Sequence, residues 1–213
     1  IIDLNKTVAM LEDAASAMKQ IAKSGKKILF VATKKQAKSL VAEAAEKLSM
    51  PYITERWPGG LLTNFATIRK SIKKMDSIDK MKVDGTFESL SKRERLQINR
   101  TREKLELNFG SIVKMNRMPE AVFIVDINKE HIALKESLKL GIRSFAITDT
   151  NTNPNLVDFP IPANDDASKS IAYLIDVISK AVAEGLDERA EEQNKKAVEK
   201  HKKAKKISED AKV

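Results

Sequence analysis

The segment Ala32–Gln36 (ATKKQ) places two lysines where an apolar run gives way to a helical pattern. At the start of a helix, free backbone N–H groups and the helix dipole favour a bound anion, and Lys34 and Lys35 strengthen that field. The segment has none of the glycines of a phosphate-binding loop or a dinucleotide fingerprint, so it does not predict a mononucleotide site. Solvated lysines in the first turn of a helix account for the same pattern equally well.

A second segment, Glu55–Phe65 (ERWPGGLLTNF), contains the single tryptophan of the chain, two adjacent glycines and an arginine. The Arg56 guanidinium can form paired hydrogen bonds to a phosphate. The glycines allow the backbone to approach a ligand closely or to adopt a positive φ. A packed turn, with Trp57 filling the edge of a sheet, is compatible with the same residues. Together the two segments predict a small anion-binding patch, the strand-end patch, formed by Lys34, Lys35 and Arg56.

Three aspartates, Asp149, Asp165 and Asp166, lie at the end of a predicted strand or just beyond one in the second half of the chain. In a parallel sheet these positions lie at the carboxyl ends of the strands, the side on which ligands bind. Converging carboxylates repel one another unless a positive charge lies between them, and a divalent cation such as Mg²⁺ or Zn²⁺ supplies one. The alternative needs no metal, because Asp166 can cap the following helix and Asp149 can be an ordinary turn residue. The sequence thus names a candidate structural cation site and requires no cofactor.

The groups needed for catalysis are scarce, and we predict no enzymatic activity, no catalytic residue and no small-molecule substrate. The absence of cysteine excludes disulfides, thiolate metal sites and a cysteine nucleophile. His131 begins a predicted helix and His201 lies in a polar tail, and neither is near a nucleophile. Two alternatives stay open: an enzyme that binds a phosphorylated small molecule at residues 32–36, and an adaptor whose acidic residues bind protein rather than RNA.

The elements that position these residues alternate along the chain. Apolar residues that recur every three or four positions predict helices, and short runs rich in branched residues predict buried strands. Helices are predicted at residues 4–22, 34–48 (with Thr33 as the cap), 129–140 and 167–184, and strands at residues 27–32, 50–54, 121–126, 144–149 and 159–161. This alternation predicts an α/β fold, a parallel sheet with helices on both faces.

Residues 64–117 interrupt the alternation with two further predicted helices, at residues 64–83 and 88–117, joined by the turn Asp84–Gly85. Their apolar stripes are narrow, which is typical of an antiparallel, coiled-coil-like helical hairpin. A first arm of about 30 Å exceeds a strand of about 20 Å, so the hairpin should project beyond the sheet. The segment contains 14 Lys and Arg against 7 Asp and Glu, a net charge of +7.

This concentration of charge predicts an arm that contacts RNA phosphates, although exposed coiled-coil faces are also routinely charged. A helix presents one side at a time, so only some of its basic residues can face RNA. The candidate contacts on the hairpin are Asn64, Arg69, Lys70, Lys73, Lys74, Lys92, Arg93, Arg95, Arg100 and Arg102.

The whole chain of 213 residues carries a net charge of +9, with a pI near 9.5, which favours a nucleic acid or an anionic membrane as partner. Its longest apolar runs are too short to cross a bilayer, and the chain opens with no secretory signal pattern. We therefore expect a cytoplasmic protein with no membrane partner. The predicted organisation is an α/β domain (residues 1–63 and 118–184), the hairpin (64–117) and a polar charged tail (185–213). Pairs such as Glu191 with Lys195 could support a solvated helix in the tail, but without an apolar face we expect it to fray or to be disordered.

Four long segments, in this order, resemble the bacterial small-subunit ribosomal protein S-two family: FVATKKQA, ERWPGGLLTNFATI, PEAVFIVDINKEHIALKESLKLGI and AITDTNTNP with the following VDFPIPANDDASKSI. The similarity covers the chain from Ile1 to about Gly185. It implies a Rossmann-like parallel sheet with an inserted α-helical hairpin, as the residue patterns predict independently.

The resemblance also implies a function. It indicates a structural constituent of the small ribosomal subunit that supports translation, binds small-subunit rRNA and has neighbouring ribosomal proteins, among them ribosomal protein S-one, as partners. It further implies that Asp149, Asp165 and Asp166 belong to a metal site completed by a histidine of the family's N-terminal segment. The role of that site would be structural, bracing the family's N-terminal segment and the surface on which ribosomal protein S-one docks.

Overall fold

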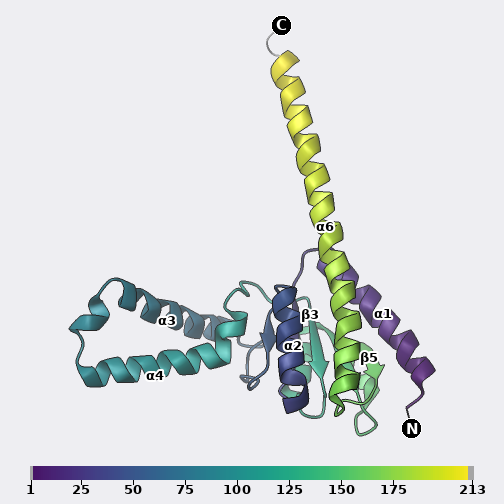
Figure 1. Cartoon of the computed structure of the whole chain (residues 1–213), viewed down its shortest axis with the longest axis horizontal. Helices are drawn as coiled ribbons and strands as arrows, with labels where there is room; N and C mark the ends of the chain where they lie inside the picture. Colours follow the sequence, from purple (N-terminus) through teal and green to yellow (C-terminus); the bar gives the residue numbers. More distant parts are fainter. Residues whose placement is uncertain (1, 211–213) are drawn as a thin grey trace.

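Five parallel strands form the centre of the fold (Figure 1). The computed structural model describes the backbone of residues 2–210 and the side chains of residues 2–195. The strands are β1 (Ile28–Val31), β2 (Tyr52–Ile53), β3 (Ala121–Val125), β4 (Arg143–Thr148) and β5 (Phe159–Pro162). Their order in the sheet is β2-β1-β3-β4-β5, and every neighbouring pair is parallel. The predicted α/β fold is confirmed.

The central strands β1 and β3 are buried along their whole length, which explains their uninterrupted apolar sequences. Alternate residues point to opposite faces of the sheet. Ile28 and Phe30 belong to the core on one face, and Leu29 and Val31 belong to the core on the other.

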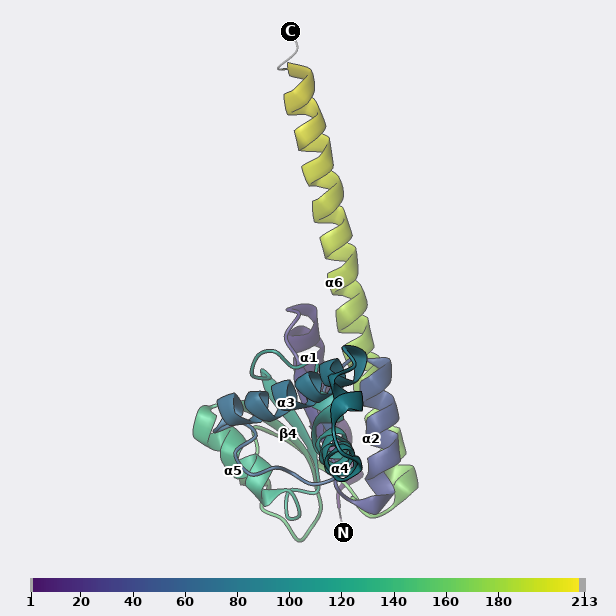
Figure 2. The same cartoon turned by 90° about the vertical axis from the view of Figure 1, so that its left-hand side faces the viewer.

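Helices cover both faces, as predicted. On one face α1 (Leu4–Lys23), α2 (Lys35–Lys47) and the first part of α6 (Ser168–Asp210) enclose the larger core. On the other face α5 (His131–Leu140) and the base of the hairpin enclose the second core. Figure 2 shows α2 and α5 on opposite sides of the sheet.

The inserted hairpin consists of α3 (Phe65–Val83) and α4 (Lys92–Phe109), joined through the 3-10 turn η1 (Thr86–Ser89). It projects sideways from the α/β domain (Figure 1). Gly85 has a φ of +79°, a conformation that glycine adopts without strain, and so makes the predicted turn possible.

The helix predicted at residues 88–117 is shorter in the structure, and both predicted ends were wrong. Ser91 and Glu94 form a reciprocal capping box, in which each side chain accepts from the backbone N–H of the other, so α4 begins only at Lys92. At the other end the helix stops at Phe109, and a 3-10 turn, η2 (Gly110–Ile112), leads the chain back toward β3.

A coiled-coil seam between the two arms stays a prediction. On α3, Ile68, Ile72, Met75 and Ile78 are buried, whereas α4 has no buried residue. Ile68 and Ile72 pack into the core of the α/β domain, so part of the α3 stripe anchors the hairpin rather than pairing with α4.

The last helix is longer than predicted, because α6 continues without a break to Asp210. That the chain frays or is disordered after residue 184 stays a prediction, and residues 211–213 lie outside the described residues. The division of the chain into a domain, a hairpin and a separate tail stays a prediction.

Ion pairs to α1 and the partly buried Leu186, which packs against the core, hold the beginning of this tail in place. Lys19 pairs with Glu184 and Glu188, at 2.9 Å each. Lys23 pairs with Glu188 and Glu192, at 2.9 and 3.1 Å. The alternation of these glutamates every four residues matches one helix face, so α6 stays beside α1 past the end of its buried stripe.

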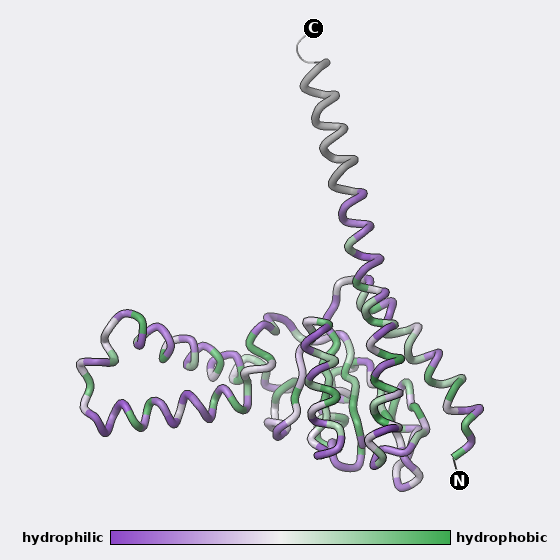
Figure 3. The backbone as a smooth tube through the Cα atoms, in the orientation of Figure 1, coloured by the Kyte–Doolittle hydropathy of each residue, from purple (hydrophilic) through white to green (hydrophobic). Residues whose placement is uncertain are grey.

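Hydropathy follows this architecture (Figure 3), with hydrophobic segments in the α/β domain and mostly hydrophilic residues, interrupted by hydrophobic ones, along the hairpin. Within the described part of the chain, no helix combines the length and the apolar character needed to cross a bilayer.

Candidate nucleic-acid interface

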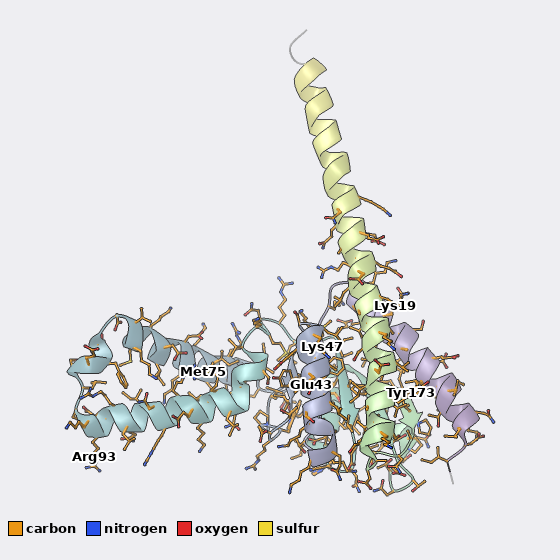
Figure 4. The ribbon with its side chains drawn as sticks, in the orientation of Figure 1. Lys19, Glu43, Lys47, Met75, Arg93 and Tyr173 are labelled. Carbon is orange, nitrogen blue, oxygen red and sulfur yellow. The ribbon has the colours of Figure 1, made fainter. Side chains whose placement is uncertain are left out.

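The hairpin exposes most of its predicted contact residues. Those that are exposed to solvent are Asn64, Lys70, Lys73, Lys74, Lys92, Arg93 and Arg100. Arg93 lies near the free end of the hairpin (Figure 4). Among the described side chains, none of the six basic residues in this group pairs with a carboxylate. Their positive charge is therefore available to a polyanion.

Three other candidates are only partly exposed. Arg102 donates to Asp79 on α3 at 2.9 Å and lies 3.4 Å from Glu106, so it ties the two arms of the hairpin together. Arg69 donates to the Met115 carbonyl at 3.3 Å and thereby fixes the base of the hairpin. Arg95 is half-buried. These contacts give Arg69 and Arg102 a structural role that the sequence did not reveal.

Lys34 lies inside a group of aspartates and not on a free surface. Its Nζ atom is 2.7 Å from Asp165, 2.6 Å from Asp166 and 3.2 Å from Asp126, and its side chain is only 15% exposed. Burial alone lowers the pKa of Lys34, but the hydrogen bonds to these three carboxylates outweigh burial and raise the pKa above its ordinary value. A lysine that is charged and already paired three times is poorly placed to bind phosphate.

The predicted aspartates do converge. Asp149, Asp165 and Asp166 each offer a carboxylate oxygen, and these oxygens lie within 4.8 Å of one another. Asp165 is buried, and its Oδ2 atom has no hydrogen-bond partner. Burial raises the pKa of Asp165, and the neighbouring charges of Asp126 and Asp149 add to the effect while Lys34 opposes it. We refer to Asp126, Asp149, Asp165 and Asp166 as the carboxylate cluster.

Asp126 was missing from the predicted site, although it is the last residue of the third predicted strand and directly follows β3 in the structure. Its φ is +68°, and its Oδ1 accepts from the backbone N–H groups of Asn128 and Lys129 at 3.0 and 3.1 Å. An aspartate at the carboxyl end of a buried strand was the signal that could have revealed it.

The crevice expected of this sheet order, between the carboxyl ends of β1 and β3, is bridged by side chains. Glu130 is buried and accepts hydrogen bonds from the Thr33 backbone N–H, at 3.1 Å, and from the Thr33 hydroxyl. Thr33 was expected to cap α2, but its hydroxyl is engaged with Glu130, and Lys34 takes the cap position without a side-chain hydrogen bond. These hydrogen bonds join the two strand ends between which enzymes of related topology bind small ligands.

The other two residues of the strand-end patch, Lys35 and Arg56, are exposed. Lys38 on α2 pairs with Glu55 at 3.1 Å, which holds the loop that carries Arg56 beside α2. Within the described side chains, neither Lys35 nor Arg56 pairs with a carboxylate.

The glycine-containing loop binds a glutamate of the same chain, a partner that the sequence analysis missed. Glu136 of α5 is buried and accepts from the Trp57 indole at 3.1 Å and from the Gly60 backbone N–H at 2.7 Å. It also accepts from the backbone N–H groups of Leu62 and Thr63, at 3.0 Å each. Burial raises the pKa of Glu136, but these hydrogen bonds outweigh it and lower the pKa below its ordinary value.

Trp57 is buried in the core of the second face, so the packed turn described above is confirmed. The signal for Glu136 was its place in the helix, three residues after the buried Ala133 and next to the buried Ser137. A glutamate on the inner face of a helix requires hydrogen-bond donors, and the adjacent glycines expose them.

The chain is similar to proteins of a single family. A family model described as Ribosomal protein S2 matches residues 1–185. The chain is 61% identical, over 93% of its length and 78% of the relative's, to "Small ribosomal subunit protein uS2" of Flavobacterium johnsoniae. It is 62% identical to the protein of the same name from Phocaeicola vulgatus, over 90% of this chain and 69% of the relative. A third relative of that name, from Bacteroides fragilis, is 59% identical, again over 90% of this chain and 69% of the relative. With most of its length matched at this level, the chain belongs to the ribosomal protein S2 family.

Proposed function

We propose that the chain binds the phosphate backbone of small-subunit rRNA through its hairpin and thereby serves as a scaffold of the small ribosomal subunit. As a member of its family it is a structural, non-enzymatic constituent of that subunit, with rRNA and other ribosomal proteins as partners. Its place is the ribosome in the cytoplasm. The residues named below as contacts are our assignment.

The observation that carries this assignment is the exposed, unpaired positive charge of the hairpin. Phosphate contacts require lysine and arginine side chains that are accessible and not already neutralised by carboxylates. Lys70, Lys73 and Lys74 on α3 meet both conditions, as do Lys92 and Arg93 on α4. Arg69 and Arg102 support the contact indirectly, because they hold the base and the two arms in place.

The strand-end patch adds a smaller contact surface through Lys35 and Arg56. The guanidinium of Arg56 suits a phosphate because it can donate two parallel hydrogen bonds. Lys34 contributes by position rather than by contact, since its ion pairs fix the turn that leads into α2.

We further propose that the carboxylate cluster holds a divalent cation and supports the docking of ribosomal protein S-one. Four carboxylates face one ammonium group, so the cluster retains a net charge of −3 when all are ionised. The spacing of the oxygens of Asp149, Asp165 and Asp166 suits ligand distances of about 2.0–2.6 Å. The unpartnered Oδ2 of Asp165 offers a ligand atom that Lys34 does not use. Because Asp166 is 71% exposed, this charge reaches the surface where a protein partner can dock.

The test of the RNA assignment uses small ribosomal subunits washed free of their own copy of this protein. Binding of the purified chain is titrated at several salt concentrations. The logarithm of the affinity should fall linearly with the logarithm of the salt concentration, with a slope of about −0.7 to −0.9 for each phosphate contact. A nearly salt-independent affinity would exclude phosphate contacts as the main source of binding.

A further inference from the structure

A basic pocket lies at the amino ends of the sheet, on the side opposite the carboxylate cluster. Its volume is about 410 Å³, and it lies among the α1–β1 turn, the segment after η2 and the start of β3. The residues that line it are Gly25, Lys26, Lys27, Lys114, Met115, Asn116, Arg117, Met118 and Glu120. We call it the amino-edge pocket.

Positive side chains outnumber negative ones among the residues that line this pocket. Lys26 pairs with Glu120 at 2.7 Å, which accounts for the single carboxylate among the lining residues. The Lys27 ammonium donates to the Ser49 carbonyl at 2.9 Å, which orients the lysine without neutralising it. Lys114 and Arg117 are exposed and, among the described side chains, have no carboxylate partner. The lining therefore has a net charge of +3.

A further cation lies beside the pocket. The guanidinium of Arg189, on α6, covers Gly25 so closely that an added Cβ would lie 2.2 Å from its Cζ atom. Gly25 has a φ of +78°, a backbone conformation that glycine adopts without strain. The positive charge thus continues from the pocket toward α6.

The pocket is also continuous with the hairpin. Lys114 and Arg117 lie a few residues beyond α4, where the chain returns from the hairpin to β3. Figure 1 shows the hairpin and the long end of α6 leaving the α/β domain in different directions, and the amino edge of the sheet lies between them. A polyanion bound along the hairpin therefore meets the amino-edge pocket at the hairpin base.

We propose that the amino-edge pocket is a second binding site for the RNA phosphate backbone, with Lys114 and Arg117 as the contacting residues and Lys27 as the supporting cation. This inference rests on the proposed function, because it extends the RNA path from the hairpin onto the domain. A phosphate group suits the site, since one arginine and two lysines without a carboxylate partner line the hollow, and its one carboxylate is paired with Lys26.

The experiment compares two double variants in rebinding to stripped small subunits. One variant, Lys114→Ala with Arg117→Ala, removes two charges from the pocket. The control, Lys6→Ala with Lys169→Ala, removes two exposed charges from the beginnings of α1 and α6. The pocket variant should bind roughly tenfold more weakly or worse near 0.1 M salt, with a salt slope shallower by about 2. The control should match the unmodified chain, and Lys114→Arg with Arg117→Lys should restore most of the slope.

An unchanged affinity and slope in the pocket variant would overturn the inference. If the unmodified chain still showed its steep salt dependence, that result would support the proposed function and would exclude the amino-edge pocket as a second binding site. Equal losses in the pocket and control variants would also count against the inference, since they would reflect total charge rather than the pocket. Thermal unfolding of each variant confirms that it is folded before binding is compared.

Discussion

Single buried charges determine much of the local structure. Glu136 is enclosed by the loop that contains Trp57 and Gly60, and Lys34 is enclosed by aspartates. Each charge is stabilised only because its partners are in place, since an ionised group in an apolar interior is otherwise costly. Substitutions at these positions therefore act through the partners that they leave without a hydrogen bond.

Replacing Glu136 with Gln should destabilise the protein by about 2–4 kcal/mol, because an amide NH₂ would face backbone donors that now bind a carboxylate. The lowered pKa of Glu136 adds a pH signature. Its contribution to stability is present above the ordinary glutamate pKa of 4.5 and is lost as the pH falls through the lower folded value. Denaturant unfolding should show a constant difference between the two proteins at about pH 5–7 that shrinks in more acidic solution.

A matched control for this experiment is Glu43→Gln, at an exposed position on α2. It should leave the free energy of unfolding within about 0.5 kcal/mol of the unmodified protein. A Glu136→Gln protein that unfolds like this control would show that the buried hydrogen bonds contribute nothing.

Replacing Asp149 with Asn tests the proposed cation site without breaking any ion pair of Lys34, because those pairs involve the other three aspartates of the cluster. We expect Zn²⁺ or Mn²⁺, added alone, to raise the melting temperature of the unmodified chain. The rise in the melting temperature of the variant should be at least about tenfold smaller. Subunits that carry the variant should also retain less ribosomal protein S-one while their rRNA affinity is unchanged. An equal response of both proteins to the metal would exclude Asp149 as a ligand.

At the scale of elements, the crossing of α1 and α6 depends on one glycine. A Cβ added at Gly185 would lie 2.4 Å from the Lys19 carbonyl oxygen and 3.1 Å from the Ala22 Cβ atom. The first contact is with backbone, which cannot move aside as a flexible side chain would. The two helices must therefore separate if residue 185 has a side chain.

Gly185→Ala should lower the free energy of unfolding by about 1–3 kcal/mol through this overpacking, despite a gain of about 1 kcal/mol in helix propensity. Thermal or denaturant unfolding measures the change. Gly59→Ala is the control, because a Cβ at Gly59 meets no atom within 4 Å and its φ is not positive. A stabilised Gly185→Ala protein would mean that the helices repack at no cost.

Helices and strands could be predicted from the sequence wherever apolar residues that recur with a regular period are also the residues buried in the fold. The strands β1 and β3 and the helices α1 and α5 follow directly from apolar runs and stripes. The start of α4 was missed because its signal, Ser91 with Glu94, lies outside any apolar stripe. The contact between α1 and α6 beyond residue 184 could not be predicted, because it depends on ion pairs, and pairing between distant segments leaves no periodic apolar pattern.

In the candidate site, too, some features could be predicted from the sequence and others could not. That Asp149, Asp165 and Asp166 converge was predictable, because parallel strands bring their carboxyl ends together. The capture of Lys34 by those aspartates was not, since residues 34 and 165 are adjacent only in the folded sheet. A sequence pattern can identify the edge of a sheet at which a residue lies, but not which neighbour neutralises its charge.

At the scale of the whole molecule, charges of opposite sign are separated across the sheet. The carboxylate cluster lies at the carboxyl ends of the strands, whereas the amino-edge pocket lies at their amino ends. The hairpin, with its net charge of +7, extends from the side of the domain. Such a distribution orients the protein on a polyanion before contact. The central claim is that the positive charge of the hairpin is what binds RNA.

The most direct test reverses charge on the exposed face of α3 and measures rebinding to stripped small subunits as a function of salt. The hairpin variant carries Lys70→Glu, Lys73→Glu and Lys74→Glu. The control variant has the same change in net charge at three exposed lysines outside the hairpin: Lys6→Glu, Lys135→Glu and Lys169→Glu.

We predict that the hairpin variant binds at least about a hundredfold more weakly near 0.1 M salt and has a salt slope shallower by about 3, whereas the control variant keeps a slope close to that of the unmodified chain. Equal affinities and slopes for the hairpin and control variants would contradict the assignment of the hairpin as the RNA-binding arm.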